Sequence, residues 1–192
     1  MYEAGLPALM LFWINEGFVA EARMLVDGRR QIVAVRSAGD VFGGLVLDEE
    51  YEFSATALTD VEAYAIPVET LSDLLESDVG LAYALADDVK QRINETCERL
   101  VVLGRLNAKA RVAHFLLELC ERDRSRGIDP HPLPLHLSRQ EIADYLGMTS
   151  ETVCRVLCKM ERDGLISLVR SDAVIVLEEK RVSELATVAA SL

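Results

Sequence analysis

The amino-acid sequence predicts an α+β protein in which a β-rich domain, a long helix and a winged helix follow one another. Short apolar stretches separated by Gly and Asp dominate the first part of the chain, as in antiparallel sheets. A regular apolar stripe then continues over several helical turns, and the last part combines two short helices with a hairpin. We expect these parts over residues 1–78, 79–105 and 106–192, because 192 residues suffice for two modest cores.

The β-rich domain is predicted from three apolar stretches, over residues 9–14, 32–35 and 55–66. The Gly and Asp residues between them are typical of tight turns. Pro67 ends this domain, and a helical region is expected from about Val68.

The helix over residues 79–105 presents one line of apolar or small side chains whose spacings alternate between four and three. This spacing is typical of a coiled-coil seam. A second copy of the chain can cover such a seam, and so can another part of the same chain. The expected seam consists of Ala82, Ala86, Val89, Ile93, Thr96, Leu100 and Leu103.

Residues 138–166 predict two helices joined by a tight turn. Ser138 can cap the first helix while Glu141 reaches back to the cap, which forms a capping box. Gly147 suits the left-handed conformation that ends a helix, and Thr149 can cap the next one. The buried faces are expected at Ile142, Ala143 and Leu146 in the first helix and at Val153, Val156, Leu157 and Met160 in the second.

The opposite face of the second helix carries Ser150, Glu151, Cys154 and Arg155 in its first two turns, and we call these four residues the reading face. Recognition helices present side chains to base edges at this place. Arg can donate two hydrogen bonds to guanine, and Glu can accept one from the amino group of cytosine. We therefore expect the reading face to contact DNA bases. The alternative is a capped helical hairpin in which Glu151 and Arg155 make only a solvated ion pair.

A hairpin after the second helix favours DNA binding. Residues 165–169 alternate as a strand, residues 170–172 can turn, and residues 173–177 can return as a paired strand. Two helices and this hairpin form a winged helix. One recognition helix contacts few bases, whereas two helices held about 34 Å apart contact a palindrome. We therefore expect a homodimer that pairs along the seam.

Charge is divided unevenly along the chain, whose formal net charge is −12. Residues 1–105 carry 8 Lys and Arg against 19 Asp and Glu, net −11, and the rest carry 12 against 13, net −1. The acidic groups are thus concentrated away from the expected DNA-binding face. The candidate phosphate contacts are Arg139, Thr149, Lys159 and Arg170.

The four cysteines and three histidines indicate neither a disulfide framework nor an enzyme. Cys97 and Cys120 suit apolar packing on helices. Cys154 and Cys158 lie four residues apart, but no further Cys or His cluster completes a metal site. No catalytic nucleophile, base or phosphate-binding loop stands out, and no segment resembles a signal or a membrane span. We expect a cytoplasmic protein without cofactor, metal or catalytic activity.

Several motifs together resemble the family of the cyclic AMP receptor protein and the fumarate and nitrate reduction regulator, the CRP/FNR transcription factors. The resemblance covers nearly the whole chain. It implies a cyclic-nucleotide-binding-like β-roll, a long dimerisation helix and a winged helix-turn-helix that regulates transcription. The motifs lie at residues 27–32, 39–44, 57–60 and 66–67 for the β-roll and at residues 138–142, 151–155 and 164–166 for the helix-turn-helix.

The reading face resembles one branch of that family. Ser150 stands where the cyclic AMP receptor branch has an Arg, whereas Glu151, Cys154 and Arg155 are similar to the Glu-x-x-Ser-Arg of the FNR and FixK branches. This resemblance implies half-sites like TTGAT in an inverted repeat. Oxidation of Cys154 would add bulk and negative charge against DNA. A redox-sensitive Cys154 is therefore one hypothesis, and an inert contact residue is the other.

The predicted β-roll lacks residues with which related sensors bind ligands. Gly44 and Phe53 replace the ribose-binding Glu and the phosphate-binding Arg of the cyclic nucleotide binders, so no cyclic AMP response is expected. No iron–sulfur cluster is expected, because no Cys precedes Cys97 and Tyr64 occupies the β-roll position of a cluster ligand. Residues 2–5 resemble a segment that in relatives follows a stretch of further N-terminal residues. We therefore expect an N-terminal segment that precedes this sequence.

By resemblance, the chain is a FixK-like regulator that acts without a coeffector on genes of low-oxygen or nitrogen-oxide respiration. RNA polymerase is an expected partner, with residues 48–52 as a candidate contact, and activation and repression both stay open. One alternative is a sensor of haem, nitric oxide or another small ligand, in a pocket lined by Phe12, Trp13 and Phe18. Another is a winged-helix interaction module that does not bind DNA.

Overall fold

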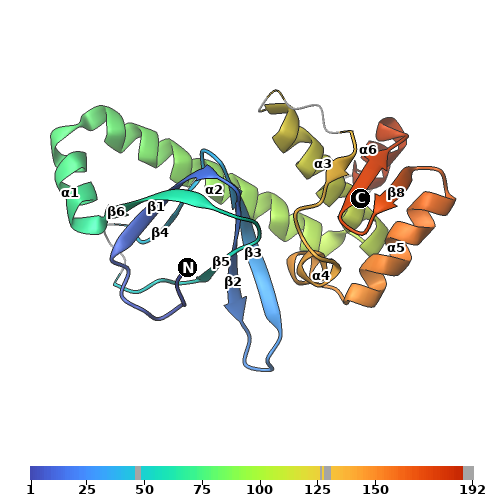
Figure 1. Cartoon of the computed structure of the whole chain (residues 1–192), viewed down its shortest axis with the longest axis horizontal. Coiled ribbons are helices and arrows are strands. Elements are labelled where there is room, and N and C mark those ends of the chain that lie inside the picture. Colours follow the sequence, from blue (N-terminus) through green and yellow to red (C-terminus); the bar gives the residue numbers. More distant parts are fainter. Residues whose placement is uncertain (46–48, 126, 128–130, 188–192) are drawn as a thin grey trace. The chain divides into compact units, whose positions relative to one another are not determined.

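The structure is a computed structural model that describes residues 1–45, 49–125, 127 and 131–187. The chain divides into two units, Met1–Glu95 and Thr96–Leu192, and the division falls inside one long helix. The predicted fold class is confirmed, since a β-rich unit comes first and a helical unit with a small sheet comes second (Figure 1).

The first unit is built from two three-stranded antiparallel sheets. One has the strand order β4-β1-β6 and the other has the order β3-β2-β5. Both sheets contribute to its core, in which Ile14, Val19, Phe42 and Ala55 are buried. The strands are β1 (Met10–Glu16), β2 (Phe18–Met24), β3 (Arg30–Ser37), β4 (Val41–Gly43), β5 (Ser54–Ala57) and β6 (Glu62–Pro67).

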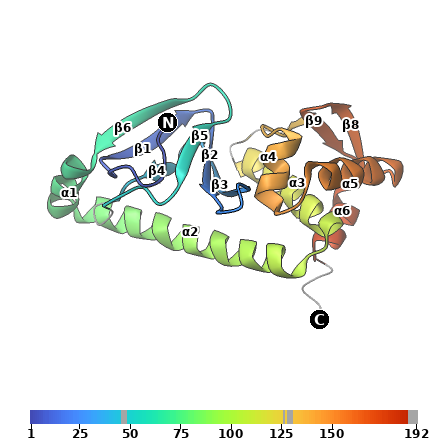
Figure 2. The same ribbon diagram turned by 90° about the horizontal axis from the view of Figure 1, so that it is seen from below.

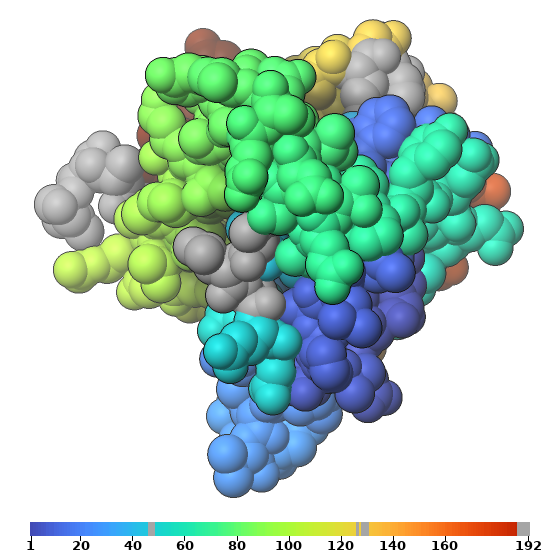
Figure 3. All heavy atoms as spheres, turned by 90° about the vertical axis from the view of Figure 1, so that its left-hand side faces the viewer, coloured from blue at the N-terminus to red at the C-terminus, as the bar shows by residue number. Residues whose placement is uncertain are grey.

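Two features of these strands differ from the prediction. β2 was not predicted, because Glu21 interrupts its apolar pattern. Glu21 is nevertheless buried, and its carboxylate accepts a hydrogen bond from Arg36 Nε of β3 at 2.8 Å. The stretch over residues 55–66 is not one strand, since it contributes to β5 and β6, which lie in different sheets. The turn between β2 and β3 projects from the unit, with Val26 fully exposed (Figures 1 and 3).

Two helices follow the strands. α1 (Val68–Ser77) packs against β1 and β6 and buries Leu71. α2 (Val79–Arg105) is one unbroken helix over the range that the apolar spacing predicted (Figure 2). Within the first unit, Arg92 of α2 donates to the Val41 carbonyl, and Glu95 of α2 lies 3.6 Å from Arg36. These polar contacts fix the first part of α2 against the strands.

The exposed side of α2 coincides only partly with the expected seam. Ile93 and Leu100 are 57% and 68% exposed. Ala82, Val89 and Leu103 are half-buried instead, because they lie on the flank of the helix that turns towards the chain's own residues. The exposed apolar or small residues that share one heptad line, interrupted at Lys90, are Val79, Tyr83, Ala86, Ile93, Cys97, Leu100 and Gly104.

The second unit combines helices with a three-stranded sheet of order β7-β9-β8. The short strand β7 was not predicted, and it pairs with β9 through Leu133 and Val174. Leu116, Ile142 and Leu157 are fully buried and come from three different helices. The elements are α3 (Ala108–Ser125), β7 (Leu133–Pro134), α4 (Arg139–Leu146), α5 (Ser150–Arg162), β8 (Ile166–Arg170), β9 (Ala173–Val176) and α6 (Glu179–Thr187).

Candidate nucleic-acid interface

α4 begins with the predicted capping box. Ser138 Oγ accepts a hydrogen bond from the Glu141 N–H at 3.2 Å, and the Ser138 N–H donates to Glu141 Oε2 at 2.7 Å. These bonds satisfy backbone donors that the start of a helix leaves without partners. Gly147 ends α4 at a φ of 61°, a left-handed conformation that favours glycine. The predicted start and end of this helix are therefore confirmed.

α5 has the predicted inner face. Thr149 caps it, with its Oγ1 accepting from the Thr152 N–H at 3.2 Å. Val153, Leu157 and Met160 are buried in the core. This packing turns the reading face and the residues that continue it outwards. Ser150 and Val156 are half-buried, and the exposed side chains are Glu151, Cys154, Arg155, Cys158 and Lys159.

Glu151 and Arg155 do not pair with each other. In the part of the chain that the structure describes, neither makes an ion pair, and Arg155 Nη2 has one long hydrogen bond of 3.4 Å to Thr152 Oγ1. The solvated ion pair of the alternative interpretation is thus not found. An exposed carboxylate and an exposed guanidinium, one helical turn apart, can instead contact hydrogen-bonding groups of a partner.

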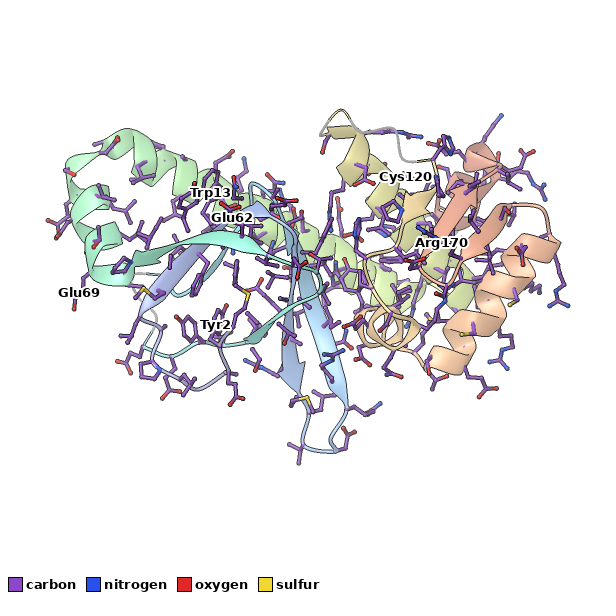
Figure 4. All side chains as sticks on the ribbon, in the orientation of Figure 1. Tyr2, Trp13, Glu62, Glu69, Cys120 and Arg170 are labelled. Carbon is purple, nitrogen blue, oxygen red and sulfur yellow. The ribbon has the colours of Figure 1, made fainter. Side chains whose placement is uncertain are left out.

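The four candidate phosphate contacts come from the helices and from the wing (residues 166–176). Arg139 lies in the first turn of α4, and its Nη1 is buried without a hydrogen-bond partner among the described residues. The Thr149 hydroxyl oxygen already accepts the hydrogen bond from the Thr152 N–H that caps α5. Lys159 is exposed on α5. Arg170 is exposed at the end of β8, 3.4 Å from Asp172 (Figure 4).

The predicted hairpin is present as β8 and β9, and it is joined to the recognition helix. Glu161, near the end of α5, accepts a hydrogen bond from the Leu168 N–H of β8 at 2.9 Å. Asp163, directly after α5, lies 2.6 Å from Lys109 Nζ of α3. The hydrogen bond from Lys109 lowers the pKa of the Asp163 carboxyl. The end of α5 is therefore held by polar contacts to the wing and to α3.

Sequence reasoning missed Arg111 of α3, which joins the ends of two helices. Its guanidinium donates to the Leu103 carbonyl at 2.7 Å, and to the Leu106 and Leu146 carbonyls at 3.0 Å each. Leu103 lies in the last turn of α2, and Leu146 is the last residue of α4. Carbonyls at a helix end lack partners within the helix, so Arg111 satisfies acceptors that no sequence motif marks.

No cofactor site is apparent among the described residues. They contain no group of three or more His, Cys, Asp or Glu side chains that could hold a metal ion. Cys120 is buried in α3, and burial raises the pKa of its thiol. Cys154 and Cys158 are both exposed on α5. None of the described helices is long and apolar enough to cross a membrane.

Both units match known domain families. Residues 1–78 match the cyclic nucleotide-binding domain, and residues 110–185 match the Crp-like helix-turn-helix domain. These matches coincide with the β-rich unit and with the elements from α3 to α6.

Similar whole proteins are regulators of transcription. The nitrogen fixation regulation protein FixK of Bradyrhizobium diazoefficiens is 35% identical over 90% of this chain and 72% of FixK. The transcriptional activator protein Anr of Pseudomonas aeruginosa is 31% identical over 87% of this chain and 69% of Anr. The solved structure of FixK2 from Bradyrhizobium japonicum matches with a TM-score of 0.88 at 30% identity, covering 96% of this chain and 91% of that one. The chain therefore belongs to the CRP/FNR family of transcription regulators, in which its resemblance to the FNR and FixK branch holds.

Proposed function

We propose that this regulator binds, as a homodimer, an inverted repeat with TTGAT-like half-sites. The observation that carries the proposal is the outer face of α5, where Glu151, Cys154 and Arg155 are exposed in the first two turns of a capped recognition helix. Arg155 donates to guanine, and Glu151 accepts from an amino group on a base edge. Ser150 and Cys154 complete the base contacts.

In this proposal, Arg139, Thr149, Lys159 and Arg170 contact the phosphate backbone. Arg139 is half-buried in the first turn of α4, and by resemblance to the family it is the best candidate for a phosphate contact. A phosphate oxygen is a suitable acceptor. Lys159 and Arg170 add exposed positive charge, which strengthens binding to any DNA sequence.

The two copies pair along the exposed heptad line of α2. Ile93 and Leu100 are large apolar residues on that line, and a partner helix would remove them from water. The flanking residues Ala82, Val89 and Leu103 then lie at the edge of the pair. Pairing of this kind separates two recognition helices by about one turn of DNA, about 34 Å, which fits an inverted repeat.

The β-roll works without a cyclic nucleotide, because its own aromatic side chains occupy the interior. Tyr2 stacks on Tyr51 with ring centroids 3.8 Å apart and also stacks with Phe12 and Phe42 (Figure 4). Burial raises the pKa of Tyr2, and the nearby Glu21 carboxylate raises it further. The Tyr2 phenol is therefore neutral, and the two described cations near it, Arg36 and Arg92, are already paired with Glu21 and Asp88.

The two replaced ligand positions agree with that proposal. A Cβ atom at Gly44 would lie 2.7 Å from the Ala8 carbonyl oxygen, so this place has no room for the ribose-binding Glu. Phe53 packs under Arg23, whose guanidinium carbon lies 5.0 Å from the ring centroid. We infer that cyclic AMP does not act on this protein.

The residues named for a haem or other ligand pocket do not line one pocket. Phe12 and Trp13 are neighbours on β1, so their side chains point to opposite faces of the sheet. Phe12 stacks on Phe42 in the core, whereas Trp13 stacks on the exposed Tyr64 at 5.5 Å (Figure 4). Tyr64 of this pair stands at the position where the resemblance places an iron–sulfur ligand in related sensors. These contacts favour a regulator without a coeffector.

Control of this regulator is proposed to act through the thiol of Cys154. The side chain is exposed on the reading face, so an oxidant reaches it and its oxidation products face the DNA. FixK is named as a nitrogen fixation regulator, and a similar protein of Vibrio cholerae is named as the fumarate and nitrate reduction regulatory protein. By that analogy the target genes serve low-oxygen or nitrogen-oxide respiration, and the protein recruits RNA polymerase in the cytoplasm. Of the candidate polymerase contact, Asp48 lies outside the described residues, and Glu52 is exposed.

The test is equilibrium binding, at fixed salt, to a duplex containing TTGAT-N4-ATCAA and to a scrambled duplex. We expect selective binding by the reduced protein and loss of that binding after peroxide treatment, with Cys154→Ser resistant to peroxide. Selectivity that persists after oxidation would remove the redox control and keep the DNA target. Absence of selectivity in both states would contradict the proposal and favour the interaction module.

A further inference from the structure

A cluster of polar side chains joins the last turns of α2 to the first helix of the helix-turn-helix. The cluster consists of Arg99 of α2, Glu118 and Arg122 of α3, and Tyr145 of α4. All four residues belong to the unit Thr96–Leu192. None of them lies on the reading face, so the DNA-contact pattern does not account for them.

One carboxylate oxygen is the centre of the cluster. Glu118 Oε1 accepts a hydrogen bond from Tyr145 Oη at 2.7 Å, and Arg122 Nη2 and Arg99 Nη2 lie 3.2 Å and 3.7 Å from it. Arg99 also donates to Tyr145 Oη. Its guanidinium carbon lies 3.7 Å from the centroid of the Tyr145 ring, which adds a cation–π contact. Groups from α2, α3 and α4 therefore share one set of bonds.

The cluster is largely shielded from water, since the side chains of Arg99, Glu118 and Arg122 are 21%, 29% and 19% exposed, so its polar contacts are stronger than they would be in water. Tyr145 is 2% exposed, and its ring meets Phe115 edge to face at 5.8 Å. Burial raises the pKa of the Tyr145 hydroxyl, which keeps its proton available for Glu118. Removing one member of such a network leaves the others without partners, and the remaining side chains must move to find new ones.

Arg99 also lies directly before Leu100, one of the exposed residues on the heptad line of α2. Leu100 and Val101 are 68% and 55% exposed, and Leu100 is on the heptad line proposed to pair with a second copy. Tyr145 is the next-to-last residue of α4, two residues before the Gly147 turn that leads to α5. The cluster thus connects residues 96–105 of α2, the part in the second unit that we call the pairing segment, to the turn before the recognition helix α5.

We propose that Arg99, Glu118 and Tyr145 are positioning residues that set the direction of α4 and α5 relative to the pairing segment of α2. They do not contact DNA. The inference rests on the proposed function, because it presupposes that paired recognition helices bind an inverted repeat. If this inference holds, the cluster affects the affinity for two half-sites bound together and leaves the affinity for a single half-site unchanged.

The test compares a full inverted repeat with a duplex that carries a single half-site. Tyr145→Phe keeps the ring and removes the hydroxyl, and Arg99→Met removes the charge. We expect each of these two variants to bind the full repeat about tenfold more weakly than the unmodified protein and to bind the single half-site with unchanged affinity. Arg99→Lys is expected to recover much of the loss. The double variant should bind the full repeat as strongly as the more weakly binding single variant, because both substitutions remove the same Arg99–Tyr145 contact.

Phe115→Leu is the matched control. It disturbs the packing of the same Tyr145 ring but leaves the bonds to Arg99 and Glu118 in place, so we expect lower thermal stability with an unchanged ratio of the two affinities. Equal losses on the full and half-site duplexes with Tyr145→Phe and Arg99→Met, or no loss at all, would overturn the inference.

A second readout does not depend on DNA. Nitroxide labels at Glu98→Cys of α2 and at Cys158 of α5, with the other cysteines changed to Ser, report the distance between the helices in labelled protein diluted with unlabelled protein. Arg99→Met should broaden that distribution, and an unchanged distribution would refute the positioning role. If the unmodified chain fails to select the repeat over scrambled DNA, the proposed function fails, and the nitroxide distances still decide this inference.

Discussion

The first unit and the reading face use charged side chains in opposite ways. In the first unit, Arg36 binds the buried Glu21 at 2.8 Å, and Arg92 of α2 binds Asp88 at 2.6 Å and the Val41 carbonyl. In the winged helix, Glu151 and Arg155 are exposed on a helix whose other face is buried. Polar groups of the first unit thus satisfy one another, whereas those of the reading face are available to a partner. This contrast agrees with the proposal that recognition depends on α5 and that the β-roll is a closed scaffold.

The largest effect is expected from opening that scaffold. Phe42 is fully buried and stacks on Phe12 at 5.1 Å. Phe42→Ala should lower the free energy of unfolding of the β-rich unit by about 3–5 kcal/mol, because it removes apolar contacts and leaves a cavity. The chain has 1 Trp, Trp13 on β1, so its fluorescence in a urea titration reports this unit. A loss below about 1 kcal/mol would show that the interior is not closely packed.

Removing one base contact should affect the other unit without unfolding it. Arg155→Ala is expected to weaken binding to the inverted repeat by about 1–3 kcal/mol per half-site, because a two-bond contact to guanine is lost. Fluorescence anisotropy with matched and scrambled duplexes measures the difference. Arg181→Ala, an exposed Arg on α6, is the control and should lose only non-specific affinity. Equal losses for both variants would mean that Arg155 contacts phosphate alone.

A smaller effect is expected at the cap of α4. Ser138→Ala removes the acceptor for the Glu141 N–H and should lower the free energy of unfolding by about 1 kcal/mol. Circular dichroism during urea denaturation measures it. Ser171→Ala, in the exposed turn of the wing, should change stability by less than about 0.5 kcal/mol. Similar losses at both positions would argue against a specific capping role.

The smallest effect is expected at an exposed ion pair, and it depends on pH. The hydrogen bond from Arg124 of α3 at 2.7 Å lowers the pKa of the Glu179 carboxyl of α6 below its ordinary value. The pair therefore adds stability at neutral pH, and this stability is lost as the pH falls through the lowered pKa. Because both side chains are about half exposed, Arg124→Met should cost at most about 1 kcal/mol at pH 7 and nothing in strong acid. A difference that is constant with pH would contradict this account.

Local signals allowed the helix-turn-helix to be predicted from the sequence. Ser138, Gly147 and Thr149 act within three or four residues of their partners, so each cap was visible as a short motif. The buried stripe of α5 followed from helical spacing alone. The base and phosphate contacts remain predictions, since they involve a DNA partner.

Features that depend on distant partners could not be predicted. β2 has a buried Glu21 whose partner, Arg36, is fifteen residues away on another strand. Arg111 and Arg99 bind groups of α4, 35 and 46 residues further along. The exposed line of α2 differs from the expected seam at Ala82, Val89 and Leu103, because spacing alone does not say which flank of a helix packs on its own chain.

Base recognition by α5 is tested by a base-substitution series in the inverted repeat, measured with the reduced protein at one salt concentration. We expect that replacing the G·C pair of one TTGAT half-site by A·T weakens binding about tenfold or more, while changes in the central spacer have little effect. Equal affinity for the original and substituted duplexes would contradict it, because the reading face would then not read the sequence.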